Sequence, residues 1–89
     1  MPSPEDALRK LLSRRIRELR EARGLRQVDL EAETGIAQPM LSQIQSGKRN
    51  PSLGNLAKIA EALNVRPAVL LLDPRRKKDR AALEALGEE

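Results

Sequence analysis

Apolar residues recur along this chain at three- and four-residue intervals, the spacing of helices that bury one side. Two long stretches follow this spacing, over residues 3–24 and 52–63, and two short ones lie between them, over 27–34 and 38–46. A fifth apolar stretch covers residues 67–72, and no segment shows the period of two that marks a strand. The sequence therefore predicts an all-α fold of five helices.

The two long helices carry clear signals at their ends. Ser3 can cap the first helix, with Pro4 at its first position, and Gly24 can end it. Ser52 can cap the fourth helix, after a loop over residues 47–51. The expected inward positions are Leu8, Leu12, Ile16 and Leu19 in the first helix and Leu53, Leu56, Ile59, Ala60 and Leu63 in the fourth.

The two short helices are separated by a tight turn at Gly35, where glycine can adopt a positive φ. Two helices joined in this way form the helix-turn-helix that reads DNA. In the second of them Leu41 and Ile44 share the inward face, which leaves Gln38, Pro39, Ser42, Gln43 and Ser46 facing outward. Because amides and hydroxyls hydrogen-bond to base edges, this uncharged face is the candidate base-reading surface.

Composition narrows the functional classes. The chain has 89 residues, enough for one domain, and lacks Cys and His, so most metal sites are removed and no constellation typical of an enzyme is present. It also lacks Phe, Trp and Tyr, on which single-stranded bases usually stack, so double-stranded DNA is the favoured partner and no cofactor is expected. The longest apolar run, residues 68–72, is too short to span a membrane. Without a signal-peptide pattern, the cytoplasm is the expected location.

The net charge of +4 is unevenly distributed. Residues 9–26 carry eight basic and two acidic side chains, residues 47–58 carry three basic ones, and residues 27–37 carry three acidic ones. Positive charge thus brackets the uncharged face on both sides, as phosphate binding requires. Helical pairs such as Arg14 with Glu18 favour the plainer explanation that part of this charge is a solvated surface.

The chain divides into a predicted domain over residues 1–72, with the helix-turn-helix at about 27–46, and a charged segment over 73–89. Asp73-Pro74 interrupts the helical pattern between them. The charged segment carries five side chains of each sign and can form a sixth helix with Ala82, Leu83 and Leu86 on one side.

Together these motifs resemble the phage-repressor-like (Xre/Cro type) helix-turn-helix family, over roughly residues 12–72. The residues that carry the resemblance are Ile16-Arg17-Glu18-Leu19-Arg20, Arg23-Gly24-Leu25, Gln27, Leu30, Thr34-Gly35-Ile36, Leu41-Ser42, Ile44, Gly47-Lys48-Arg49-Asn50-Pro51-Ser52-Leu53, Leu56, Ile59-Ala60 and Ala62-Leu63. The resemblance implies a five-helix, lambda-repressor-like domain that binds double-stranded DNA.

The resemblance also implies which residues contact DNA. Gln27 would hold a phosphate at the start of the second helix, where free N–H groups attract anions, and the loop residues Lys48, Arg49 and Asn50 would hold another. Bases would be read by Gln38, Pro39, Ser42 and Gln43. The alternative for each is an ordinary solvated residue, and it is strongest for Lys48 and Arg49 because surface loops are often basic.

Two local departures from the family pattern lead to further expectations. Gln45 replaces a glutamate that commonly pairs with the arginine at the position of Arg20, and Glu31 replaces an alanine. One hypothesis is that Glu31 pairs with Arg20 instead, and the alternative is that Glu31 faces solvent. Arg26 and Ala37 occupy cap positions where the family prefers Ser or Thr, so the second and third helices are expected to begin less firmly.

The favoured function is a sequence-specific transcriptional regulator, a repressor that acts as a homodimer. One recognition helix reads only a few base pairs, whereas two copies would read half-sites about 34–36 Å apart. The alternatives are an antitoxin-like repressor whose charged tail binds a toxin protein, a restriction–modification controller and, from another class, a helical adaptor that binds only protein.

The expected dimer interface lies in the fifth helix. There Ala68 and Val69 stand where the family often has acidic residues. If Leu70 and Leu71 face the core, Val69 and Leu72 are left exposed as an apolar contact surface. The competing explanation is intramolecular, with Leu83 and Leu86 of the tail folding back over the same patch.

Overall fold

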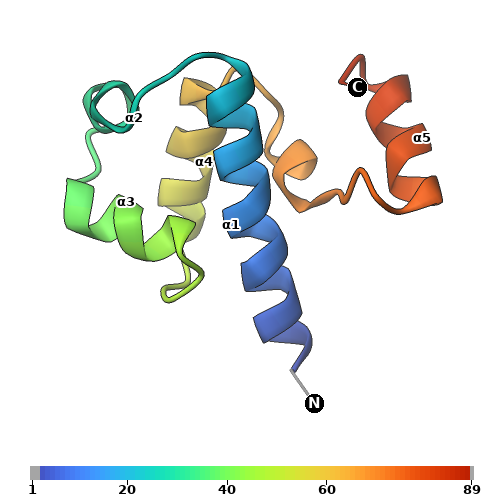
Figure 1. Cartoon of the computed structure of the whole chain (residues 1–89), viewed down its shortest axis with the longest axis horizontal. Helices are drawn as coiled ribbons and strands as arrows, with labels where there is room; N and C mark the ends of the chain where they lie inside the picture. Colours follow the sequence, from blue (N-terminus) through green and yellow to red (C-terminus); the bar gives the residue numbers. More distant parts are fainter. Residues whose placement is uncertain (1–2, 89) are drawn as a thin grey trace.

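The computed structural model describes residues 3–88, which form a bundle of helices (Figure 1). The elements are α1 (Pro4–Ala22), α2 (Gln27–Thr34), α3 (Gln38–Gln45), α4 (Leu53–Ala62), the 3₁₀ helix η1 (Pro67–Leu71) and α5 (Lys77–Ala85). No strand occurs between residues 3 and 88, so the all-α prediction is confirmed, and the charged tail forms a helix. Within this range no helix is both long enough and apolar enough to cross a membrane.

The predicted caps of the two long helices are confirmed. The Ser3 hydroxyl accepts the N–H of Asp6 at 3.1 Å, and the Asp6 carboxylate accepts the N–H of Ser3 at 3.4 Å. These bonds from Ser3, the backbone one foremost, hold the pKa of Asp6 below its usual value. Ser52 likewise accepts the N–H of Asn55 at 3.0 Å, which fixes the start of α4.

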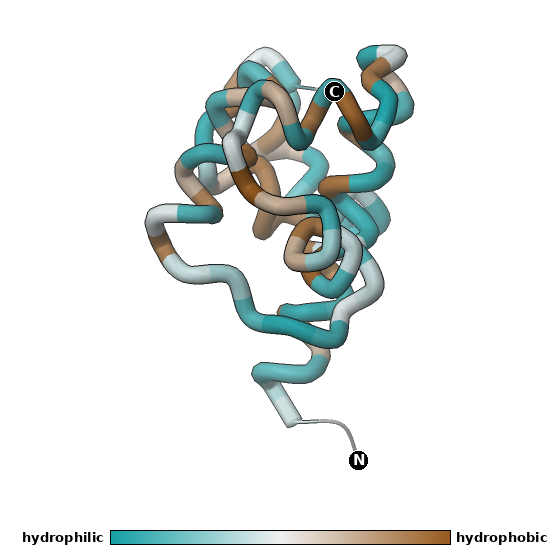
Figure 2. Tube along the Cα trace, turned by 90° about the vertical axis from the view of Figure 1, so that its left-hand side faces the viewer, coloured by the Kyte–Doolittle hydropathy of each residue, from teal (hydrophilic) through white to brown (hydrophobic). Residues whose placement is uncertain are grey.

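The core is wholly aliphatic and draws on every helix of the described chain. In Figure 2 hydrophobic positions alternate with hydrophilic ones along the trace, as amphipathic helices require. The buried apolar residues are Leu12, Ile16, Leu19, Leu30, Ile36, Leu41, Ile44, Ile59, Ala60, Leu63, Val69, Leu70 and Leu83. Leu8 and Leu53 were expected among them, but they are 48% and 85% exposed, because Leu53 is the first residue of α4 and Leu8 precedes Leu12, where the buried positions of α1 begin.

The expectation that Val69 is exposed is wrong. Val69 is 1% exposed and Leu70 is fully buried, whereas Leu71 is 37% exposed and Leu72 is partly buried. The segment is a 3₁₀ helix, in which side chains three residues apart lie on the same side. Val69 and Leu72 therefore share a side, and that side faces the core instead of solvent.

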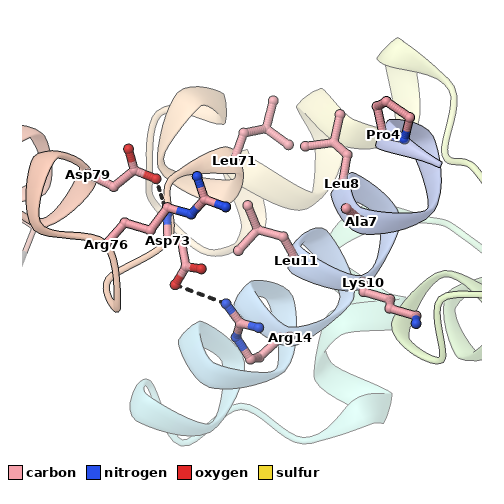
Figure 3. Close-up of a pocket in the computed structure, with 10 residues that line it drawn as sticks. All are labelled: Pro4, Ala7, Leu8, Lys10, Leu11, Arg14, Leu71, Asp73, Arg76 and Asp79. Carbon is pink, nitrogen blue, oxygen red and sulfur yellow. Dashed lines mark hydrogen bonds and ion pairs between the residues drawn. The ribbon is translucent and has the colours of Figure 1, made fainter. Parts of the chain in front are cut away.

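The charged segment after residue 72 is held against the bundle by a buried leucine and by an ion pair. Leu83 of α5 is 1% exposed within the core, and Leu86 is 38% exposed. Figure 3 shows the polar part of the attachment, in which Arg14 of α1 pairs with Asp73 at 3.0 Å and Asp79 accepts the N–H of Asp73 at 2.8 Å. The intramolecular explanation is thus correct for Leu83.

Candidate DNA interface

The outward face of α3 has the composition that the sequence predicted. Gln38, Pro39, Ser42, Gln43 and Ser46 are all exposed. Leu41 and Ile44 are buried beneath them, at 0% and 1% exposure. In Figure 1, α3 lies at the opposite edge of the molecule from α5, so the tail does not cover this face.

The turn between α2 and α3 is fixed by a side chain and a glycine. The Thr34 hydroxyl donates to the carbonyl of Leu30 at 2.7 Å and accepts the N–H of Ile36 at 3.1 Å. Gly35 has a φ of 71° and donates its N–H to the carbonyl of Glu31 at 2.9 Å. Glycine adopts this left-handed conformation without the steric cost of a Cβ, so α3 leaves the turn in one defined direction.

A buried amide joins the three N-terminal helices. Gln45 of α3 is 5% exposed and exchanges two hydrogen bonds with Gln27 of α2, at 2.9 and 3.3 Å. Its Oε1 also accepts a hydrogen bond from Arg20 of α1 at 3.3 Å, and Arg20 donates to the carbonyl of Leu25 at 2.9 Å. Gln45 thus accepts the hydrogen bond from Arg20 in place of a glutamate. The hydrogen bonds among Gln27, Gln45 and Arg20 were not predicted from the sequence.

The hypothesis that Glu31 pairs with Arg20 is wrong. Arg20 contacts Gln45, the Leu25 carbonyl and, at 3.9 Å, Glu21. Glu31 lies instead beside a shallow hollow at the outside of the helix-turn-helix, where it is partly exposed. The donors of the Arg20 guanidinium are thus directed to the Gln45 amide, the Leu25 carbonyl and the Glu21 carboxylate, and not to Glu31.

The N-terminus of α2 is better stabilised than the sequence indicated, because the side chain of Asp29 forms hydrogen bonds there. Its carboxylate accepts the backbone N–H of Arg26 at 2.8 Å and pairs with the guanidinium of Arg26 at 3.1 Å. Hydrogen bonds from the Arg26 side chain and backbone lower the pKa of Asp29. The expectation of a weak start stands only for α3, where Ala37 makes no side-chain cap.

We expect the stabilising effect of Asp29 to disappear in acid. Because its pKa is lowered by folding, its contribution is present above the unfolded-state pKa and is lost as pH falls through the folded-state value. Thermal unfolding of wild type and Asp29→Asn should therefore differ at about pH 6 and converge towards about pH 3. Glu33→Gln is the control, since Glu33 makes no hydrogen bond or ion pair with the described residues, and a pH-independent difference for Asp29→Asn would contradict the capping role.

Two of the four predicted phosphate ligands have side chains that form hydrogen bonds with neither α1 nor α2. Lys48 and Arg49 are exposed, and Arg49 donates its Nε–H to Oε1 of Gln43 at 2.6 Å, so it lies beside the base-reading face. Gln27 is partly buried against Gln45, although the first N–H groups of α2 remain without intrahelical acceptors. Residues 3–88 contain no cluster of acidic side chains that could hold a metal ion.

Asn50, the fourth predicted phosphate ligand, is turned towards α1. Its Nδ2 donates to Glu5 at 2.6 Å, and its Oδ1 accepts a hydrogen bond from Arg9 at 2.8 Å. Arg9 and Glu5 could not be predicted as partners of Asn50, because they lie 41 and 45 positions away from it and before the segment that carries the family resemblance.

Comparison with known proteins agrees with this arrangement. The helix-turn-helix family model matches residues 16–70. The chain is 40% identical over 58 residues to the uncharacterized HTH-type transcriptional regulator y4dJ of Sinorhizobium fredii, covering 65% of this chain and 75% of that protein. It is 41% identical over 54 residues to the HTH-type transcriptional regulator DdrOP3 of Deinococcus deserti, covering 61% of this chain but only 42% of that protein.

Two crystal structures have the same fold. The restriction-modification controller protein C.AhdI from Aeromonas hydrophila superposes with a TM-score of 0.69 at 38% identity, covering 72% of this chain and 97% of that one. The hypothetical transcription factor NHTF from Neisseria superposes with a TM-score of 0.76 at 31% identity, covering 93% of this chain and 91% of that one. The chain belongs to the Xre/Cro-like helix-turn-helix family of DNA-binding transcriptional regulators.

Proposed function

We propose that this regulator is a repressor that binds its operator as a homodimer, with α3 in the major groove. In this proposal Gln38, Pro39, Ser42 and Gln43 contact base edges. Phosphates are held by Lys48 and Arg49 and by Gln27 at the start of α2, and Asn50 contributes through its backbone. No catalytic role is proposed for any residue.

The observation that carries the proposal is the exposed, uncharged face of α3 with Lys48 and Arg49 at its C-terminal end. Amides and hydroxyls on a rigid helix can read base edges, and the adjacent cations supply attraction for phosphate. Surfaces that bind protein are enriched in aromatic and Met side chains, and the outward face of α3 carries neither. The hydrogen bonds among Gln27, Gln45 and Arg20 hold α3 in a fixed position relative to α1 and α2.

Selection of duplexes from a random library, followed by mobility-shift titrations at several salt concentrations, tests this proposal. A preferred duplex should emerge, and its affinity should fall steeply with salt. A protein that enriches no sequence and forms no specific complex at any salt concentration would be an adaptor instead.

Lys48→Ala is expected to weaken binding to preferred and random duplexes alike. The Lys48 side chain makes no hydrogen bond or ion pair with the described residues, so its ammonium is available to a phosphate. Losing one phosphate contact should lower the slope of log affinity against log salt by about 1. Lys58→Ala, on α4, is the matched control, and an unchanged slope for Lys48→Ala would make Lys48 an ordinary solvated lysine.

The dimer surface that we propose replaces the one expected from the sequence, since Val69 is buried. Leu8, Leu53 and Leu71 are 48%, 85% and 37% exposed, and they line a hollow of about 280 Å³ together with Leu12, Pro51 and Leu56 and with the polar residues Glu5, Arg9 and Asn50. Exposed leucines gathered around one hollow are typical of an interface. Under a two-fold axis the same patch would meet itself, as homodimer contacts do.

The size of the molecule also supports a dimer. The described chain measures 34 × 33 × 20 Å. Two copies of this size related by a two-fold axis can place their recognition helices about one helical turn of DNA apart, which is about 34–36 Å. Such a pair would cover adjacent half-sites on one side of the duplex and could exclude other proteins from it.

A restriction–modification controller is the second candidate function. It is favoured by the likeness to C.AhdI, whose chain is covered almost completely, at 97%, by this one. Genes for a restriction enzyme and a methyltransferase beside the gene for this chain would support that role. Neighbouring phage genes would favour an ordinary repressor instead.

A further inference from the structure

The loop that follows α3 is held by a polar ring from the start of α1. Arg9 donates its Nε–H to the carbonyl of Gly47 at 3.0 Å and an Nη1–H to Oδ1 of Asn50 at 2.8 Å. Glu5 accepts hydrogen bonds from Nδ2 of Asn50 at 2.6 Å and from Nη1 of Arg9 at 3.1 Å. Arg9, Asn50 and Glu5 therefore form a closed ring, and Arg9 is only 23% exposed within it.

We propose that Arg9, together with Glu5, is a positioning residue for the phosphate-binding loop, and that the side chain of Asn50 anchors this loop and does not itself bind phosphate. The inference rests on the proposed function of this loop. Gly47 and Asn50 lie on either side of Lys48 and Arg49, so Arg9 fixes both ends of the segment that carries the two cations. The cations are then held next to α3 before DNA arrives, which lowers the entropy lost on binding.

The backbone of the loop shows why an anchor is useful. Gly47 has a φ of 77° and ends α3, and the N–H of Lys48 returns to the carbonyl of Gln43 at 2.9 Å. Among the described residues no backbone hydrogen bond extends this pattern to Arg49 or Asn50, so the side-chain contacts with α1 hold the rest of the loop. Without this anchor the loop would move freely and would lose conformational entropy when it became ordered on the duplex.

Arg9 is itself poorly placed to contact phosphate. A guanidinium has five N–H donors, and those of Arg9 serve Gly47, Asn50, Glu5 and, through Nη2, Asp6. The carboxylates of Glu5 and Asp6 also neutralise the positive charge of the Arg9 guanidinium. Arg9 precedes residue 16, where the family match begins, so the ring is built by a part of this chain that lies outside the shared motif.

The test compares Arg9→Ala, Arg9→Lys and Asn50→Ala with the control Arg17→Ala. Arg17 is exposed on the same helix, and its side chain donates a hydrogen bond to the carbonyl of Ser13 within that helix. Affinity for the duplex selected by wild type should fall about tenfold for Arg9→Ala relative to Arg17→Ala, with a salt slope lower by about 1. Arg9→Lys should not restore binding, because an ammonium keeps the charge but cannot reproduce the fork of Nε and Nη1.

The double variant Arg9→Ala/Asn50→Ala should lose little more than either single variant, because both act through one ring. Thermal unfolding and light scattering on each variant separate this effect from loss of folding or of assembly. Equal affinities of Arg9→Ala and Arg17→Ala, full rescue by Arg9→Lys, or additive losses would overturn the inference. A wild-type protein that selects no duplex would contradict the proposed function instead.

Discussion

Gln38→Ala is expected to weaken binding to the preferred duplex by about 1–3 kcal/mol and to relax the base preference at one position. Gln38 is exposed in the first turn of α3, and its side chain makes no hydrogen bond to the described residues. Its amide is therefore free to offer both a donor and an acceptor to one base, and adenine is the base whose edge matches that pair. Selection repeated with the variant would identify the position.

Ser46→Ala is the matched control for Gln38→Ala. Ser46 is exposed just after the last residue of α3, but its hydroxyl donates to the carbonyl of Gln43 at 3.1 Å, so it offers less to a base. Gln43→Ala is less suitable, because it also releases Arg49. Equal weakening of Gln38→Ala on every duplex would identify Gln38 as a phosphate contact.

The helices could be predicted from the sequence because their ends are decided locally. Ser3 and Ser52 cap their own helices through bonds that span three residues. Gly35 similarly ends α2 through its own backbone conformation. Where the deciding partner is distant, prediction failed. The burial of Val69 depends on the 3₁₀ geometry of η1 and on how the core closes around it, and neither can be read from apolar spacing.

The candidate DNA interface was likewise predictable only where a feature depends on a single helix. The outward face of α3 follows from the position of Leu41 and Ile44 alone, so it was predictable from one helix. The partners of Gln45 and Asn50 come from α1 and α2, at separations of 18 to 45 residues. An amide pairs with many donors and acceptors, so residue type does not reveal which distant partner it has.

Leu53→Asp is expected to convert a wild-type dimer into a monomer with unchanged helicity. Leu53 is 85% exposed, so the substitution leaves the core intact, and an acidic residue in the first turn of α4 suits the helix dipole. In the proposed dimer, however, the carboxylate would be buried in an apolar contact, where an unpaired charge is strongly unfavourable. Light scattering at about micromolar concentration measures the change.

The same variant should lose most of its affinity for a complete operator while keeping its affinity for a half-site. Binding of the second half-site by a linked copy can raise affinity by about 10²–10⁴, so a monomer should lose a factor in that range. Leu86→Asp is the control, because Leu86 is a 38% exposed leucine directly after α5, outside the proposed patch. A Leu53→Asp protein that is still dimeric would place the interface on another surface. A wild-type protein that is monomeric both alone and on the operator would contradict the homodimer.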